Sequence, residues 1–133
     1  MTARPDGSDA PTVDTAVASP IDPLAIERLR ELDPGGSLGT LRRVLEAYQQ
    51  SLRRHLDDIG AAHAGHESEH LARAVHTMKS SSAAVGALVF SQRCADVEHL
   101  LRSGHGWPDG LQVEALIHEG RRVLSAVGAM LSA

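Results

Sequence analysis

The sequence is poor in aromatic residues, and it contains a single cysteine. It has one tryptophan, one tyrosine and one phenylalanine among 133 residues, which are too few for a base-stacking surface or an aromatic ligand pocket. The formal net charge of −4 argues against nucleic acid as the main partner, because phosphate binding needs a clustered basic surface. A lone cysteine cannot form an internal disulfide, which favours the reducing cytoplasm.

Long apolar runs are missing as well, and no charged start followed by an apolar run indicates export or a membrane span. Helix-forming residues dominate, whereas β-branched and aromatic residues are scarce, so the composition favours helices over strands. With 42% apolar residues in 133, the chain is long enough to bury the core of one domain. We therefore expect an all-α, cytoplasmic protein.

The N-terminal region differs in composition from the rest of the chain. Residues 1–20 mix Pro, Asp, Ser, Thr and Ala without apolar periodicity, which predicts a disordered tail followed by a domain over residues 21–133. Asp22 followed by Pro23 is typical of a helix start, and we expect a short covering helix that stops at residues 33–36. The apolar contacts of this helix are expected from Leu24, Leu29 and Leu32.

Four longer amphipathic helices are predicted after it. The first begins near residue 37 and spans about 25 residues, or roughly 38 Å. The second is expected over residues 67–85 and the third over 88–102, while Asp109 can cap a fourth. Helices of this kind with short connections predict an antiparallel up-and-down four-helix bundle. The first helix is expected to bury Leu38, Leu41, Leu45, Tyr48, Leu52, Leu56 and Ile59. The third is expected to bury Phe90, Cys94, Val97 and Leu101.

The second long helix is predicted to expose one histidine. Its buried stripe consists of Leu71, Val75, Met78 and Val85, with the small Ser82 in register. His76 lies roughly 140° from the centre of this stripe, and Ala72, Arg73, Lys79 and Ser80 share its outward row. An exposed neutral imidazole is a competent nucleophile toward an activated phosphoryl group, and an ammonium at i+3 can offset the phosphoryl charge.

The segment from Leu71 to Glu98 resembles the histidine-containing phosphotransfer (HPt) domains of multistep two-component phosphorelays. The resemblance implies that His76 is the phosphoacceptor, that Lys79 helps to neutralise the phosphoryl group, and that Gly86 forms the turn between two bundle helices. It also implies a donor phospho-aspartate on one receiver domain and an acceptor aspartate on another. The residues that carry the resemblance are His76, Lys79, Ser82, Gly86, Ala87, Leu88, Cys94, Val97 and Glu98.

The resemblance implies response-regulator receiver domains and a hybrid sensor histidine kinase as partners, with Mg²⁺ held by the receiver. No glycine-rich phosphate loop, nucleotide motif or Mg²⁺-binding acidic cluster is visible in the sequence, so we expect no cofactor of its own and a carrier more than an enzyme. Serine at position 80 departs from the family's usual glycine, and we expect tolerance with altered partner preference. Receiver contacts are expected from Ala72, Arg73, Ser80 and Ala83. A monomer is expected because one bundle can consume all the apolar stripes.

The alternative is a non-catalytic scaffold bundle in which His76 is an ordinary surface residue. His63, His66 and His70 have a spacing that would suit a metal-responsive version, although polar residues at a helix junction are usually just solvated. We therefore predict no metal site. Ser82 is interpreted as a small residue that permits close helix packing, and Cys94 as a core residue without a redox role.

Overall fold

The computed structural model describes residues 19–104 and 106–133 of the chain. Within these ranges the chain forms helices and no strands, as the all-α prediction expected. The helices are α2 (Pro23–Glu31), α3 (Thr40–Ala64), α4 (Ser68–Ala84), α5 (Leu88–Ser103) and α6 (Gly110–Ser132).

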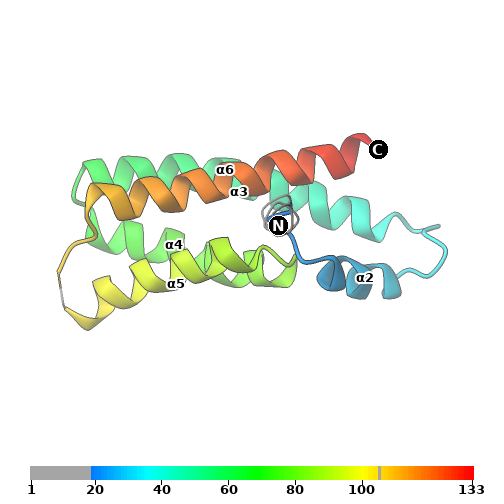
Figure 1. Cartoon of the computed structure of the whole chain (residues 1–133), viewed down its shortest axis with the longest axis horizontal. Helices are drawn as coiled ribbons and strands as arrows, with labels where there is room; N and C mark the ends of the chain where they lie inside the picture. The colour runs from blue at the N-terminus through cyan, green and yellow to red at the C-terminus, as the bar shows by residue number, and fades with distance from the viewer. Residues whose placement is uncertain (1–18, 105) are drawn as a thin grey trace, which may run out of the picture.

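Helices α3 to α6 form a four-helix bundle. Helix α3 packs against both α4 and α6, and α5 likewise packs against α4 and α6, so the four helices close a ring around a common core. Figure 1 shows α3 and α6 running together above α4 and α5, with the short α2 beside one end of the bundle. The predicted bundle with a covering helix is confirmed.

The core is apolar and closely packed. Helices α3, α5 and α6 all contribute fully buried side chains to it, among them Leu52, Ile59, Phe90 and Val123. Gly120 lets α6 approach its neighbours, because a Cβ at this position would lie 2.5 Å from Leu56 Cδ2 and 2.9 Å from Phe90 Cε1. The close approach keeps the helices in a fixed register, which matters for side chains that meet across them.

The covering helix α2 begins as predicted but packs differently. The Asp22 carboxylate accepts a hydrogen bond from Leu24 N at 3.0 Å, and Pro23 occupies the first turn. The prediction that Leu24 and Leu32 pack against the bundle is wrong, because their side chains are 62% and 66% exposed. Ile26 is the buried residue of this helix, since nine residues present only a narrow face to α3.

Helix α3 begins at Thr40, a few residues later than predicted. Leu38, expected on the buried stripe, is instead 63% exposed. The loop before the helix is organised by Asp33, whose buried carboxylate accepts hydrogen bonds from Leu38 N at 3.0 Å and Thr40 N at 3.2 Å. The Asp33 carboxylate thus satisfies the amide of the first residue of α3, and Leu38 lies in the loop before it.

The turn between α4 and α5 depends on Gly86. Its φ of +86° is in the left-handed region, where glycine is favoured. An added Cβ would lie 2.7 Å from Ala25 Cβ and 2.9 Å from Asp22 O, so a side chain has no room either. Asp22 N also donates to Gly86 O at 2.8 Å. The predicted turn at Gly86 is therefore present, and the segment before α2 is attached to it.

The N-terminal prediction can be compared with the structure only at its end. Residues 1–18 of the predicted tail lie outside the described residues. Ser19 is exposed, and its hydroxyl donates a hydrogen bond to Ile21 O at 2.9 Å. Ile21 is buried in the core. Among the described helices, none has both the length and the apolar character needed to cross a membrane.

Candidate functional site

Helix α4 presents His76 and Lys79 at its surface. The predicted stripe of Leu71, Val75, Met78 and Ser82 is buried. The side chain of His76 lies on the opposite side and is 58% exposed, with Lys79 partly exposed one turn later. The amphipathic pattern therefore orients the histidine as predicted.

Of the four residues expected to contact a partner, three are exposed and one is buried. Arg73, Ser80 and Ala83 are exposed. The prediction that Ala72 shares the outward row is wrong, because it is only 3% exposed. Helix α4 packs against both α3 and α5, so its buried arc is wider than a single stripe and includes Ala72. This alanine cannot contact a partner.

A carboxylate from α5 meets both α4 side chains. Glu98 Oε2 lies 2.7 Å from His76 Nδ1, and Glu98 Oε1 lies 2.7 Å from Lys79 Nζ. The Glu98 side chain is only 12% exposed. One carboxylate therefore bridges the two residues at the boundary between the core and the surface.

The charge of Glu98 determines which nitrogen of His76 carries the proton. Burial raises the pKa of Glu98, but the hydrogen bonds from Lys79 and His76 lower it by more than burial raises it. The pKa of Glu98 therefore lies below the ordinary 4.5. Glu98 is thus an ionised acceptor near neutral pH, and His76 Nδ1–H must be the donor. In the neutral ring, Nε2 then has a free lone pair, and no described residue hydrogen-bonds to it.

The sequence analysis placed Glu98 among the residues that carry the family resemblance but gave it no role. The buried residues predicted for the third long helix, which include Cys94, did contain a signal for such a role. Glu98 follows Cys94 by one helical turn, and Cys94 is fully buried, so position 98 lies on the inward side of the helix. An inward carboxylate needs a partner, because burying an unpaired charge is costly.

Two further contacts hold α4 in place around the site. The Ser91 hydroxyl of α5 donates to Lys79 O at 2.7 Å, which ties the backbone beside the lysine to the next helix. Tyr48 of α3 and Ser82 share a buried hydrogen bond of 2.7 Å between their hydroxyls. Burial raises the pKa of Tyr48 to about 12, so the phenol stays neutral. Ser82 thus combines close packing with a hydrogen bond.

Cys94 is a core residue, as its interpretation from sequence proposed. Its side chain is fully buried. Burial, together with the nearby negative charge of Glu98, raises the pKa of the thiol to about 12. A thiol in this environment stays protonated and is a poor nucleophile.

The histidines at the other end of α4 have a different arrangement. His63 Nε2–H donates to Pro108 O at 2.8 Å. The rings of His63 and His66 are stacked with Trp107, at centroid distances of 5.5 and 4.5 Å. His70 is exposed. Among the described residues, no three His, Cys, Asp or Glu side chains are grouped so that they could hold a metal ion.

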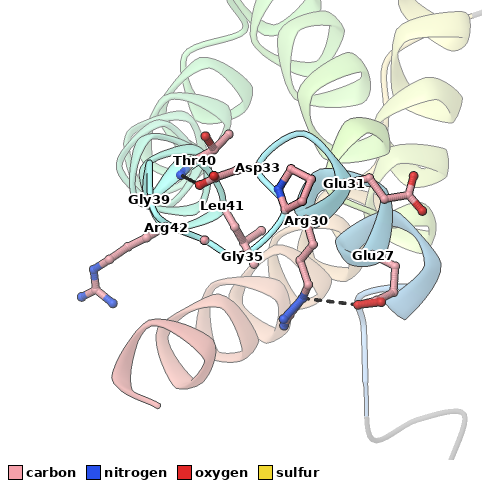
Figure 2. A pocket seen from close by; sticks show the side chains of 11 residues that line it. Glu27, Arg30, Glu31, Asp33, Gly35, Gly39, Thr40, Leu41 and Arg42 are labelled. Atoms are coloured by element: carbon pink, nitrogen blue, oxygen red, sulfur yellow. Dashed lines mark hydrogen bonds and ion pairs between the residues drawn. The ribbon is translucent and has the colours of Figure 1, made fainter.

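A hollow of about 650 Å³ lies between α2, the loop after it and the start of α3. None of the residues that line it belongs to α4 or α5. Figure 2 shows the Asp33 side chain turned toward Thr40, and Arg30 paired with Glu27. The carboxylate of Asp33 accepts hydrogen bonds from the amides of Leu38 and Thr40, so its role is to hold the loop.

Comparison with protein-family models matched the Hpt domain over residues 43–132, which is more than half of the chain. Comparison with curated proteins and with solved structures gave no match. The matched range includes most of α3 and all of α4, α5 and α6, and so covers His76, Lys79 and Glu98. The chain therefore belongs to the Hpt domain family.

Proposed function

We propose that His76 accepts a phosphoryl group from a receiver-domain phospho-aspartate and passes it to an aspartate of a second receiver. Hpt domains carry phosphoryl groups in two-component phosphorelays and interact with receiver domains and kinases. The observation that carries this proposal is the 2.7 Å contact between His76 Nδ1 and Glu98 Oε2, made by an imidazole that is otherwise exposed. It leaves Nε2 free for attack.

The proposed step is a displacement at phosphorus. The Nε2 lone pair forms the N–P bond while the P–O bond to the receiver aspartate breaks, and the aspartate leaves as a carboxylate. Because Nδ1 keeps its proton, the ring becomes positively charged as the bond forms. Glu98 is in place to stabilise this charge. The reverse step returns the phosphoryl group to an aspartate.

Lys79 is proposed to neutralise the phosphoryl oxygens. Its ammonium lies one helical turn from His76, on a flexible side chain that is held at rest by Glu98. We propose that Mg²⁺ is supplied by the receiver and that the protein is a carrier rather than a catalyst. Arg73, Ser80 and Ala83 are proposed to contact the receiver, since they are exposed around His76. The proposal includes a monomeric protein that meets its receivers and a hybrid kinase in the cytoplasm.

The test is transfer of label from a phosphorylated receiver, with Mg²⁺, to wild type, His76→Gln and Lys79→Ala. We expect acid-labile, alkali-stable label on wild type and none on His76→Gln. Lys79→Ala should slow transfer by about tenfold to a hundredfold, which is less than the loss of a preorganised oxyanion donor causes, because the ammonium is partly exposed. Circular dichroism should show equal helicity in all three, because both side chains lie at the surface.

The scaffold alternative predicts the opposite result. In that case wild type would take no label from any of a broad set of receivers, and His76→Gln would change nothing. Label on His76→Gln equal to that on wild type would also exclude His76 as the acceptor.

A further inference from the structure

The carboxylate of Glu98 has a third basic neighbour, Arg102. Arg102 Nε lies 3.5 Å from Glu98 Oε2, the same oxygen that accepts the proton of His76 Nδ1. The two residues are four positions apart on α5, so their side chains lie along one face of the helix. Glu98 is therefore surrounded by His76, Lys79 and Arg102.

The three contacts differ in length. Those from His76 and Lys79 are both 2.7 Å, at the short end of the ordinary range for charge-assisted hydrogen bonds. The contact from Arg102 is long, and the guanidinium also lies 3.7 Å from Glu69 Oε1 on the first turn of α4. Arg102 thus spans from α5 to α4 without being fully engaged by either carboxylate. It has donors to spare, because a guanidinium carries five N–H groups.

The proposed transfer step makes two demands on Lys79. The ammonium is bonded to Glu98 Oε1 in the free protein, and it is needed at the phosphoryl oxygens during transfer. If it moves to the phosphoryl group before the N–P bond forms, while the His76 ring is still uncharged, Glu98 loses its shortest cationic contact although its side chain is only 12% exposed. A poorly solvated carboxylate without a counter-ion tends to take up a proton or turn toward solvent. Either change would remove the acceptor from His76 Nδ1.

We propose that Arg102 is a positioning residue that keeps Glu98 ionised and facing His76 while Lys79 serves the phosphoryl group. This inference rests on the proposed function of His76. Arg102 shortens its contact with Glu98 as Lys79 leaves, so that one cation replaces another on the same carboxylate. Arg102 acts through Glu98 and does not touch the phosphoryl group.

The first experiment needs no phosphoryl donor. Lys79→Met imitates the departure of the ammonium, and ¹⁵N NMR of the His76 ring at a pH where the ring is neutral reports which nitrogen is protonated. Wild type and Lys79→Met should both show the Nδ1–H tautomer. Lys79→Met combined with Arg102→Met should show a mixture of tautomers, and Arg102→Lys in place of Arg102→Met should restore the Nδ1–H form. Retention of the Nδ1–H form in the Lys79→Met, Arg102→Met variant would overturn the proposal.

A matched control uses another arginine of the same helix. Arg93 is exposed on α5 and makes no ion pair with Glu98 among the described contacts. Arg93→Met combined with Lys79→Met should leave the tautomer unchanged. A shift of the same size as that caused by Arg102→Met would overturn the proposal, because a general loss of positive charge would then explain both.

The second experiment measures transfer from a phosphorylated receiver. Arg102→Met should slow transfer by about threefold, as expected for a partly exposed ion pair, and Arg102→Lys should recover most of the rate. In the Glu98→Gln background, Arg102→Met should have no further effect, because Arg102 acts through Glu98. An equal slowing in both backgrounds would mean that Arg102 contacts the phosphoryl group or the receiver directly, which overturns the positioning role.

The two experiments separate this inference from the proposed function. A wild-type chain that takes no label from any receiver would contradict the proposed function, while the tautomer measurements would still report on Arg102. Normal labelling of wild type with no tautomer change in the double variant would overturn the role of Arg102 alone.

Discussion

His63 and His76 each make one hydrogen bond from a ring nitrogen to an oxygen atom, yet the two rings differ in the partner that they bond and in their surroundings. His63 uses Nε2–H to reach the carbonyl of Pro108 and stacks on Trp107, at the end of the bundle. His76 uses Nδ1–H to reach the ionised carboxylate of Glu98, and its side chain is mostly exposed. One histidine joins a helix to a loop, and the other keeps a nitrogen free.

The comparison shows that the partner of an imidazole, rather than the residue type, determines its possible chemistry. A neutral carbonyl fixes the ring but does little to stabilise a positive charge on it. A carboxylate fixes the tautomer and also favours the cationic ring that forms when the free nitrogen becomes bonded. This difference can be tested by substitutions at each site.

The largest expected effect comes from matched substitutions of the two histidines. His76→Gln should abolish label transfer with little change in the free energy of unfolding. His63→Gln should leave transfer within about twofold and lower stability by about 1 kcal/mol, because the ring contact with Trp107 is lost. Label transfer and urea denaturation measure the two effects. Loss of transfer in His63→Gln with an intact fold would contradict the assignment of separate roles.

Glu98→Gln should have the next largest effect. The amide keeps the size of the side chain but removes the charge that stabilises the imidazolium and holds Lys79, so transfer should slow by about tenfold to a hundredfold. NMR of the His76 ring should also show loss of the single Nδ1–H tautomer. The matched control is Glu114→Gln, which changes an exposed carboxylate on α6 and should transfer at the wild-type rate. A wild-type rate for Glu98→Gln would refute the role of the carboxylate.

The pH dependence of stability gives a smaller effect with a defined sign. The pKa of Glu98 is lower in the folded protein than the ordinary 4.5, so the folded state binds this proton less readily than the unfolded chain does. The ionised carboxylate therefore stabilises the fold above about pH 4.5, and this contribution is lost as the pH falls through the lower folded value.

The measurement compares wild type with Glu98→Gln by urea denaturation across pH 3 to 7, in roughly the range where carboxyl groups titrate. Wild type should be the more stable at pH 7, and the difference between the two should shrink as the solution becomes acidic. A difference that grows below about pH 4.5 would mean that the folded protein does not lower the pKa of Glu98.

Ser80→Gly is expected to give the smallest effect. Ser80 is exposed one turn after His76, where members of the family usually carry glycine. Glycine should lower stability by about 0.5–1 kcal/mol because it is a poor helix former, and it should change the relative transfer rates among receivers. Ser81→Gly, at the next position, is the control for the helix effect. Identical receiver preferences in wild type and Ser80→Gly would remove Ser80 as a determinant of partner choice.

Much of the fold could be predicted because its signals are local. The spacing of apolar residues identified four long helices and their inward faces, and Gly86 and Asp109 correctly marked a turn and a helix start. The errors came where tertiary packing overrides a local pattern. The burial of Leu24 and Ala72 depends on the width of the packed face of their helices, and Leu38 is exposed because it lies in the loop before α3.

The candidate site could be predicted only in part. His76 and Lys79 were identified from one helix, and their roles remain predictions. The role of Glu98 could not be found in the same way, because it lies 22 residues from His76 on another helix. A contact across helices depends on their register, which the periodicity of either helix alone does not specify.

By itself, the sequence determined the helical segments, the inward stripe of α4 and the outward direction of His76, because apolar periodicity acts within a few turns of one helix. Only the tertiary structure decided that a carboxylate from α5 meets both His76 and Lys79, and that His63 bonds the carbonyl of Pro108 instead. These contacts depend on the turn at Gly86 and on the close packing of the bundle. Side chains that are distant in sequence meet only when the whole core sets the register of the helices.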